Sequence, residues 1–411
     1  MNETFEIRID SIAAGGDGVG RHGGMVVFVP RTAPGDIARI EAHKEGRLMR
    51  GRVLKLLTSS PDRVEPACRH FVSDSCGGCQ LQHLSYEAQL SAKAGIISDA
   101  LTRVGGISVA PPKVEPSESR WRYRRKLTLA FRRKDGAWIS GLHRLNSPDS
   151  VFSLSDCEIT DDTVMGFWRL VRAQSELLPS DRDLRIAVRA LSPGFSLVIE
   201  GGTSWDRHHA LFNAVPDLTE LWWAPREQRP RLLQSRAPNA SGASFTQVNE
   251  GVAAALRSHV VQLARQSSPT SAIDAYAGTG DIAVALAVTG MRVTAIEVDS
   301  AASKACATRL PTGSRSVNSS VESALATALP ADLVVVNPPR AGLTPEVIQT
   351  LQRSSPQSPV PCPLIYVSCN PATLARDLKR MDRYRVTSVR GFDMFPQTAH
   401  VETVVALEPA A

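Results

Sequence analysis

Cys369 stands where a thiol could do chemistry, between a short apolar run and the start of a predicted helix. The stretch YVSCNPATLAR covers residues 366–376, in which Asn370 fits a helix cap and Pro371 a first helical turn. The dipole of such a helix stabilises a thiolate that precedes it. The pattern alone leaves three uses open: a buried thiol, a metal ligand or a nucleophile.

Four other cysteines have the spacing of a metal or cluster site. Cys68, Cys76 and Cys79 follow the pattern Cys-x7-Cys-x2-Cys, and Cys157 lies far downstream. Four thiolates can hold a [4Fe–4S] cluster or a tetrahedral zinc ion, and the spacing does not choose between them. A total of seven cysteines is odd, and no export signal is evident, so a disulfide framework is the less favoured interpretation.

A glycine-containing turn follows a predicted strand in IDAYAGTGDI, residues 273–282. Gly278 and Gly280 would let a ligand approach the backbone where helix N–H groups point at it. Glu297 ends the next predicted strand about 20 residues later, where a carboxylate can accept both hydroxyls of a ribose. Dinucleotide and P-loop patterns are absent from the turn. The combination resembles the S-adenosylmethionine-dependent methyltransferase fold, and a generic α/β domain with an empty crevice is the alternative.

A third motif of this pocket is VVVNPPRAGL, residues 334–343, in which Asn337 ends an apolar strand. In related folds an Asn or Asp at this strand end, held rigid by prolines, lies beside the methyl donor and reads the substrate. Alone, the motif would also fit an N-methyltransferase, where Asn and a carbonyl hold an amine. The pocket therefore predicts methyl transfer without naming the accepting atom.

The cysteine helps to name that atom, because methylation of an amine needs no thiolate. Uracil C5 is too weak a nucleophile to attack a sulfonium methyl, whereas addition of the Cys369 thiolate to C6 turns C5 into an enolate carbon. The C5 proton must then be removed before the cysteine can leave. Glu402 is the candidate base, since its apolar neighbours Val401 and Val404 should raise its pKa by desolvation. A surface carboxylate on an edge strand is the alternative.

Three segments are expected to position these residues. Residues 1–58 contain several short strands with Gly-rich turns, typical of a small OB-like β-barrel. Basic residues from Lys44 to Lys55 indicate either RNA binding or only a solvated strand pair. Residues 241–411 alternate strand-like and helical stretches, which predicts a doubly wound, Rossmann-like α/β domain with a mostly parallel sheet.

Residues 59–240 form the predicted central α+β domain. It begins with the cysteine-rich loop and continues with helical periodicity over residues 85–106, which ends at a glycine pair. The segment 118–134 interleaves Arg and Lys with aromatic residues such as Trp121 and Tyr123. Cations and aromatics together suit stacking and phosphate contacts on single-stranded RNA, although a plain basic strand face has the same composition.

Four stretches together resemble the RNA 5-methyluridine methyltransferases, in the branch with an N-terminal TRAM domain and an iron–sulfur cluster. They are SFTQVNEGV (244–252), NPPRAGL (337–343), YVSCNPATLARDL (366–378) and DMFPQTAHVE (393–402). The resemblance covers nearly the whole chain. It implies methylation of uridine C5 in 23S ribosomal RNA or in the T-loop of tRNA, with S-adenosyl-L-methionine as cofactor.

The same resemblance implies roles for individual residues. Cys369 would be the nucleophile and Glu402 the base. A [4Fe–4S] cluster rather than zinc would be held by Cys68, Cys76, Cys79 and Cys157, with a structural role. The donor and uracil site would be lined by Gln247, Tyr276, Gly278, Glu297 and Asn337.

Two positions depart from the family pattern. Asn337 stands where the family usually has Asp, so its contact with uracil N3–H would be weaker. Ser320 stands where an acidic or amide residue commonly approaches the adenine. These departures keep a third interpretation open, an RNA-binding protein with zinc or an iron–sulfur cluster and an inactive methyltransferase domain.

Composition limits the compartment and the partners. No apolar run approaches the ~20 residues that span a bilayer, and the N-terminal MNETFEIRID is too polar for a signal peptide. We therefore expect a cytoplasmic protein with no membrane partner, acting as a monomer. A net charge of +6 and a pI near 9.0 favour a polyanionic partner, here RNA.

Overall fold

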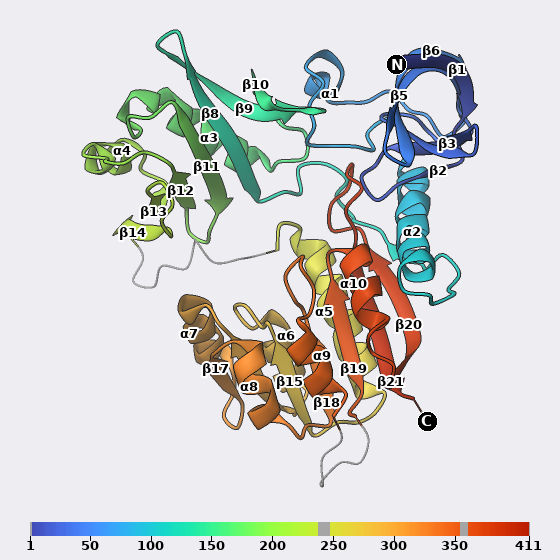
Figure 1. The fold of residues 1–411 in the computed structure, drawn as a ribbon. Helices are drawn as coiled ribbons and strands as arrows, with labels where there is room; N and C mark the ends of the chain where they lie inside the picture. The colour runs from blue at the N-terminus through green and yellow to red at the C-terminus, as the bar shows by residue number, and fades with distance from the viewer. Residues whose placement is uncertain (1, 237–246, 354–360, 411) are drawn as a thin grey trace.

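Residues 2–236, 247–353 and 361–410 are described by the structure, a computed structural model of the 411-residue chain. Their strands form three sheets, which Figure 1 shows in separate parts of the molecule. The predicted fold class is confirmed: a barrel, a mixed α and β central part and a Rossmann-like C-terminal sheet. None of the described helices is both long and apolar enough to cross a membrane.

The first sheet has six strands and curls into a small barrel (Figure 1). Alternation explains its core, because Ala38, Ile40 and Ala42 point inward while Arg39 points to solvent. In sheet order the strands are β1 (Asn2–Arg8), β5 (Ile37–Glu45), β6 (Leu48–Thr58), β4 (Met25–Val29), β3 (Gly18–His22) and β2 (Ser11–Ile12).

The second sheet has seven strands and packs one face on a helical layer. Helix α3 (Asp162–Ala173) begins at its N-cap Asp161, whose carboxylate accepts from the Thr163 N–H, and buries Phe167 and Trp168 against the sheet. The other helical elements of this part are α1 (Arg69–Ser73), η1 (Ser175–Leu177) and α4 (His208–Ala214). In sheet order the strands are β10 (Ser147–Ser153), β9 (Ala137–Arg144), β8 (Lys126–Lys134), β11 (Asp183–Ala190), β12 (Phe195–Glu200), β13 (Leu218–Ala224) and β14 (Arg231–Ser235).

The third sheet has eight strands, and its parallel centre is buried on both faces. The runs LVVV and LIYVS are buried throughout, as expected for strands covered by helices on both sides. In sheet order the strands are β17 (Arg315–Asn318), β16 (Arg292–Glu297), β15 (Ser271–Ala275), β18 (Leu333–Val336), β19 (Leu364–Ser368), β21 (Glu402–Pro409), β20 (Tyr384–Phe392) and β7 (Val114–Glu115). The helices are α5 (Glu250–Arg265), α6 (Asp281–Ala287), α7 (Ser300–Arg309), α8 (Val321–Ala328), α9 (Pro345–Leu351) and α10 (Pro371–Leu378).

One helix from the first third of the chain joins this last sheet. Helix α2 (Tyr86–Arg103) starts at Ser85, whose hydroxyl accepts from the Ala88 N–H, and buries Ile97 and Leu101 in the C-terminal core. Strand β7 then pairs with β20 at the edge of the sheet. Both elements fall inside the range 59–240 that was expected to form the central domain. They nevertheless pack with the C-terminal sheet, so that range does not fold as one separate unit.

Candidate active site

The carboxyl ends of the parallel strands bring the predicted site residues to one edge of the third sheet. Strands β15, β16, β18 and β19 run in the same direction, so Tyr276, Glu297, Asn337 and Cys369 all lie at or just beyond their ends. Strand β21 runs the opposite way and begins at this edge. Because Ser368 pairs with Thr403, the start of β21 at Glu402 lies next to Cys369.

Cys369 is half-buried between β19 and α10. Asn370 caps the helix, since its Oδ1 accepts from the Ala372 N–H at 3.1 Å, and Pro371 occupies the first turn as predicted. Burial raises the pKa of the Cys369 thiol, and the nearby Glu402 carboxyl raises it further. Desolvation therefore outweighs the stabilisation that the helix start was expected to give the thiolate.

Glu402 is 5% exposed and is the first residue of β21, opposite Phe392 of β20. Burial raises the pKa of its carboxyl to about 7, and the Arg340 guanidinium opposes that rise. The predicted direction of the shift agrees with this environment. A carboxyl that titrates near neutral pH can accept a proton from a reacting carbon and return it to solvent.

Arg340 is the residue that the sequence analysis passed over. Its guanidinium lies close enough to Cys369 and to Glu402 to lower the pKa of both. The surrounding loop is fixed on α10, because Asp377 Oδ2 accepts from the Leu343 N–H and from the Tyr366 hydroxyl, both at 2.8 Å. The motif NPPR did contain this residue, but only the folded chain reveals that one cation faces both acidic groups.

The glycine turn after β15 leaves room for a ligand. Gly278 has φ +56°, and a β-carbon there would meet nothing within 4 Å, whereas a β-carbon on Gly280 would lie 2.3 Å from the Cys306 sulfur. Gly280 is thus required by packing, while Gly278 leaves the backbone open. Tyr276 also has φ +62°, and its pKa is raised by burial and by Glu322 of α8, to which its hydroxyl donates.

Glu297 is tied to that turn by two backbone amides. The Gly278 N–H donates to its Oε2 at 2.7 Å and the Asp299 N–H to its Oε1 at 2.8 Å. The next residue, Val298, is 68% exposed, so an apolar surface adjoins the carboxylate. Beneath the turn lies Asp274, which the sequence analysis did not consider; burial raises the pKa of its carboxyl to about 7. An oriented carboxylate, an open backbone and an apolar patch fit a nucleoside ligand.

Two predicted residues are less clearly joined to this edge. Gln247 lies half-buried two residues before Asn249, the N-cap of α5. In the described part of the chain no hydrogen bond connects Gln247 with the strand-end residues, so its place in the site stays a prediction. Ser320 caps α8 by accepting from the Ser323 N–H, and its relation to an adenine likewise stays a prediction.

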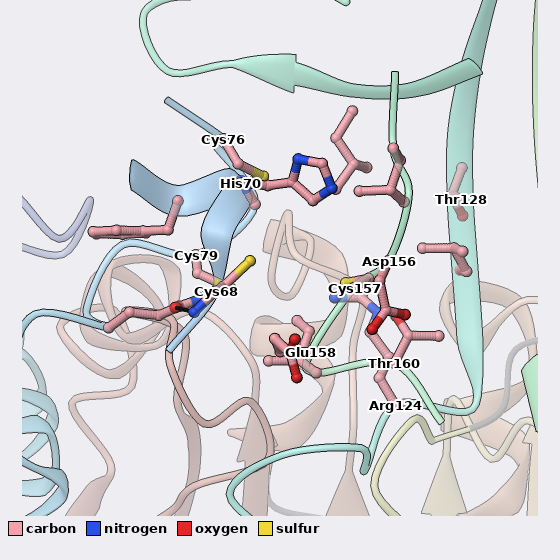
Figure 2. A pocket seen from close by; sticks show the side chains of 17 residues that line it. Cys68, His70, Cys76, Cys79, Arg124, Thr128, Asp156, Cys157, Glu158 and Thr160 are labelled. Atoms are coloured by element: carbon pink, nitrogen blue, oxygen red, sulfur yellow. Dashed lines mark hydrogen bonds between the residues drawn. The ribbon is translucent and has the colours of Figure 1, made fainter. Parts of the chain in front are cut away.

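The four predicted metal ligands line one cavity of about 190 Å³ (Figure 2). Cys68 is the N-cap of α1, Cys76 and Cys79 follow that helix, and Cys157 lies on the segment after β10. Burial raises the pKa of Cys76 to about 11, and the neighbouring Cys157 and Cys68 add to that rise. The thiols therefore lie on the walls of one cavity. Apolar residues such as Phe71, Leu127 and Leu154 line it as well, together with charged ones, Arg124, Asp156 and Glu158.

This donor set fits a thiolate-bound group in its chemistry and shares one cavity. Four sulfur atoms around one small cavity suit an iron–sulfur cluster or zinc. Within the described ranges, however, no three His, Cys, Asp or Glu side chains already stand in metal-holding geometry. His70, which also lines the cavity, is engaged elsewhere, with Asp74 at 2.7 Å and Ser155 at 2.8 Å.

Comparisons with known families agree with both ends of the chain. A family model described as tRNA (Uracil-5-)-methyltransferase matches residues 312–410, the part that contains Asn337, Cys369 and Glu402. A second model, the TRAM domain, matches residues 1–45, which fall in the six-stranded barrel.

Whole-chain relatives extend that agreement. An uncharacterized RNA methyltransferase of Synechocystis sp. is 32% identical over 460 residues, which cover 99% of this chain and 96% of the relative. Another, from Thermosynechococcus vestitus, is 30% identical over 453 residues, or 98% of each chain. The solved tRNA (uracil-54, C5)-methyltransferase of Pyrococcus abyssi, in complex with S-adenosyl-L-homocysteine, has the same fold, with a TM-score of 0.71 at 23% identity, covering 98% of this chain and 100% of that one. The chain therefore belongs to the family of RNA (uracil-5-)-methyltransferases.

Proposed function

We propose that the protein methylates C5 of a uridine in structured RNA through a covalent bond between Cys369 Sγ and uracil C6. The observation that carries this proposal is the juxtaposition of Cys369, Arg340 and Glu402 at the strand ends, beside the open glycine turn. An N-methyltransferase would leave both the thiol and the buried carboxyl without a use.

The glycine turn and Glu297 are the proposed site of the methyl donor. S-adenosyl-L-methionine, when bound, supplies an electrophilic methyl group. Glu297 would accept from the ribose hydroxyls, because its carboxylate is already oriented by two amides. Gly278 would let the ligand lie close to the backbone, and Val298 would cover an apolar part of it.

Cys369 and Arg340 are assigned to the first half of the reaction. The thiol loses its proton to solvent, and Arg340 favours the resulting thiolate by its charge. Attack of the sulfur on C6 breaks the C5=C6 double bond and moves its electron pair to C5, which becomes an enolate carbon. This carbon is nucleophilic enough to accept the methyl group.

Glu402 is assigned to the second half. The methylated adduct carries a proton on C5, and the carboxylate removes it as a general base. The electrons of the broken C–H bond re-form C5=C6 and expel the Cys369 thiolate, so the enzyme and the methylated RNA separate. A pKa of about 7 leaves a large share of Glu402 ionised at neutral pH.

The RNA substrate is proposed to be 23S ribosomal RNA first and the T-loop of tRNA second. The TRAM barrel and the exposed cations Arg120, Arg133 and Lys134 of the segment 118–134 support an RNA contact outside the catalytic domain. Tyr123 and Phe131 of that segment are buried, so they are not available to stack on bases as predicted. Within the barrel, Arg50 and Arg52 already form ion pairs with Glu45 and Glu41, so phosphates would have to compete for them. We further propose that the protein acts as a cytoplasmic monomer with three working units: residues 1–58, residues 59–240 without α2 and β7, and residues 241–411 with α2 and β7 added to them.

The cysteine cavity is proposed to hold a [4Fe–4S] cluster on Cys68, Cys76, Cys79 and Cys157, with a structural role. Protein purified without oxygen should then be brown, with broad visible absorbance. A colourless preparation that contains zinc would refute the cluster and favour the tetrahedral alternative.

The experiment that tests the function is a map of 5-methyluridine in total RNA from cells with and without the gene. One uridine in 23S ribosomal RNA should lose its methyl group when the gene is absent. Loss in the tRNA T-loop instead would change the substrate but keep the reaction. An unchanged map, with purified protein that transfers no methyl group to either RNA, would overturn the proposal.

A further inference from the structure

The connection between β20 and β21, residues 393–401, leads directly into Glu402 and is held from outside its own sheet. Asp393 is fully buried and accepts hydrogen bonds from the Lys93 ammonium and the Tyr86 hydroxyl, the latter at 2.8 Å. Lys93 also donates to the Phe395 carbonyl at 3.0 Å. Both donors lie on α2, so this helix fixes the beginning of the connection.

Gln397, within this connection, is hydrogen-bonded both to α2 and to the end of the cysteine-rich loop. It is 3% exposed and has φ +71°. Its N–H donates to Gln89 Oε1 at 2.9 Å, and its Oε1 accepts from Gln89 Nε2 at 3.0 Å. Its carbonyl accepts from the backbone N–H groups of Gln80 and Leu81, at 3.1 and 3.0 Å. Two segments distant in sequence thus share one buried residue.

One of those segments is the end of the cysteine loop. Gln80 and Leu81 directly follow Cys79, so the wall of the cysteine cavity donates two hydrogen bonds to the connection. Tyr123 adds a second link, because it packs with Cys68 and Cys79 and its hydroxyl donates to the Pro396 carbonyl at 3.0 Å.

The nucleophile has separate supports. Cys369 is placed by β19 and α10, with Ser368 accepting from the Asn370 N–H at 3.1 Å and Asn370 capping the helix. A general base must lie within hydrogen-bond reach of the proton that it removes, and a displacement of about 1 Å can cost a large factor in rate. Disturbing the connection should therefore move Glu402 while leaving Cys369 in place.

We propose that Gln397 is a positioning residue that joins the cysteine segment, residues 68–81, to the connection and so fixes Glu402 against Cys369. The inference rests on the proposed covalent mechanism. Its consequence is specific: disorder at the cysteine cavity slows the release of the enzyme from methylated RNA and leaves formation of the covalent bond intact.

Gln397→Gly tests the positioning role, because glycine adopts the positive φ without strain and removes the side-chain link to Gln89 of α2. The two hydrogen bonds from Gln80 and Leu81 go to the backbone carbonyl and remain, so the link to the cysteine segment is tested by Cys79→Ala. Slow release follows the irreversible methyl transfer, so kcat should fall about tenfold, a modest part of a general base's contribution. The ratio kcat/KM should stay unchanged, and a covalent RNA–protein band should persist on a denaturing gel. Gln89→Ala removes the same side-chain link from the α2 side, together with the acceptor of the Gln397 backbone N–H, and should give the same split if the glycine variant does not fold.

A matched control is Gln352→Gly. Gln352 likewise links two segments through its amide, accepting from the Arg383 N–H and donating to the Arg380 carbonyl, both at 3.1 Å, but it does not lie on the path to Glu402. Its kinetics should equal those of the wild type. Cys79→Ala should resemble Gln397→Gly in the gel assay, which reads the adduct and does not depend on turnover.

The outcomes separate this inference from the proposed function. If Glu402→Gln gives no covalent band, the mechanism and the inference both fail. If Glu402→Gln traps the band but Gln397→Gly and Gln89→Ala turn over like the wild type, the inference alone is overturned. A parallel loss of kcat and kcat/KM in these variants would also overturn it, since that pattern indicates general damage to the site.

Discussion

The nucleophile and the base lie side by side at one sheet edge, yet they are supported by different parts of the chain. The loop beside Cys369 is fixed by residues 337–378, through Asp377 and the cap at Asn370. The approach to Glu402 is fixed by residues 80–123, on α2 and the cysteine segment. The first half of the site is thus a property of two consecutive βα units, β18–α9 and β19–α10, and the second depends on the assembly of the whole protein.

Removing the nucleophile should have the largest effect. Cys369→Ser leaves a hydroxyl that is far harder to ionise than a thiol, so the addition to C6 is lost. We expect methyl transfer to fall roughly 10⁶-fold, as when another enzyme loses its essential nucleophile. Transfer of labelled methyl to RNA measures the loss, and calorimetric titration with the donor should give wild-type affinity. Retained activity would sink the covalent mechanism.

Removing the base should block the second half of the reaction, the release of the enzyme from the methylated RNA. Glu402→Gln keeps the size of the side chain but cannot accept the C5 proton, so turnover should fall by about 10²–10⁴-fold. Unlike the cysteine variant, it should accumulate a covalent RNA–protein complex that survives denaturing electrophoresis. A variant that is equally slow but forms no complex would show that Glu402 is needed before the covalent adduct forms, and that it is not the base that removes the C5 proton.

The two supports should also differ in stability. Lys93→Met leaves the buried Asp393 without its cation, which should lower the free energy of unfolding by roughly 3–5 kcal/mol. Arg376→Met on the nucleophile side should cost less, about 1–3 kcal/mol. It leaves the buried Oδ1 of Asp377 without its donor, but Arg376 is 38% exposed and Oδ2 keeps the Leu343 N–H and the Tyr366 hydroxyl. Denaturant titration of both variants measures the difference. Equal losses would contradict the contrast between the two supports.

The smallest expected effect is the response to pH. The carboxyl of Glu402 has its pKa raised to about 7, so the basic form is lost as the pH falls through that value. The rate of adduct breakdown should decline about tenfold per pH unit below it and level off above. The same shift means that burial of this group costs folding stability as the pH rises through 7. A flat breakdown rate between pH 5 and 8 would argue against Glu402 as the base.

Local patterns predicted the half of the site that is built locally. The glycine turn, the strand end at Glu297 and the cap after Cys369 each depend on a few consecutive residues, and the structure contains all three. The raised pKa of Glu402 followed from its apolar neighbours. The helix start after Cys369 predicted a stabilised thiolate, whereas the structure raises the pKa of this thiol. Burial and the facing Glu402 carboxyl cause the rise, and both are tertiary effects that the local sequence does not reveal.

The supports of Glu402 depend on contacts between distant segments, and the sequence pattern that points to them is weaker. Lys93, Ile97 and Leu101 recur at a spacing of four residues and therefore share one face of α2. A lysine in an apolar stripe implies a buried partner, but no local rule identifies Asp393, 300 residues away. The pairing of β7 with β20 is similarly long in range, and for the same reason the range 59–240 did not predict where α2 packs.

The packing of helix α2 against the third sheet also has a consequence for folding during translation. This helix leaves the ribosome long before β20 and β21. Its apolar face and Lys93 therefore stay without their native contacts until the last part of the chain has been translated. Such pairings of high sequence separation form late and slowly. A fragment that starts at residue 241 would lack β7, α2 and the donors to Asp393 and Gln397. The catalytic sheet is therefore completed from the other end of the chain, and dividing the protein at residue 241 separates the base from its anchor.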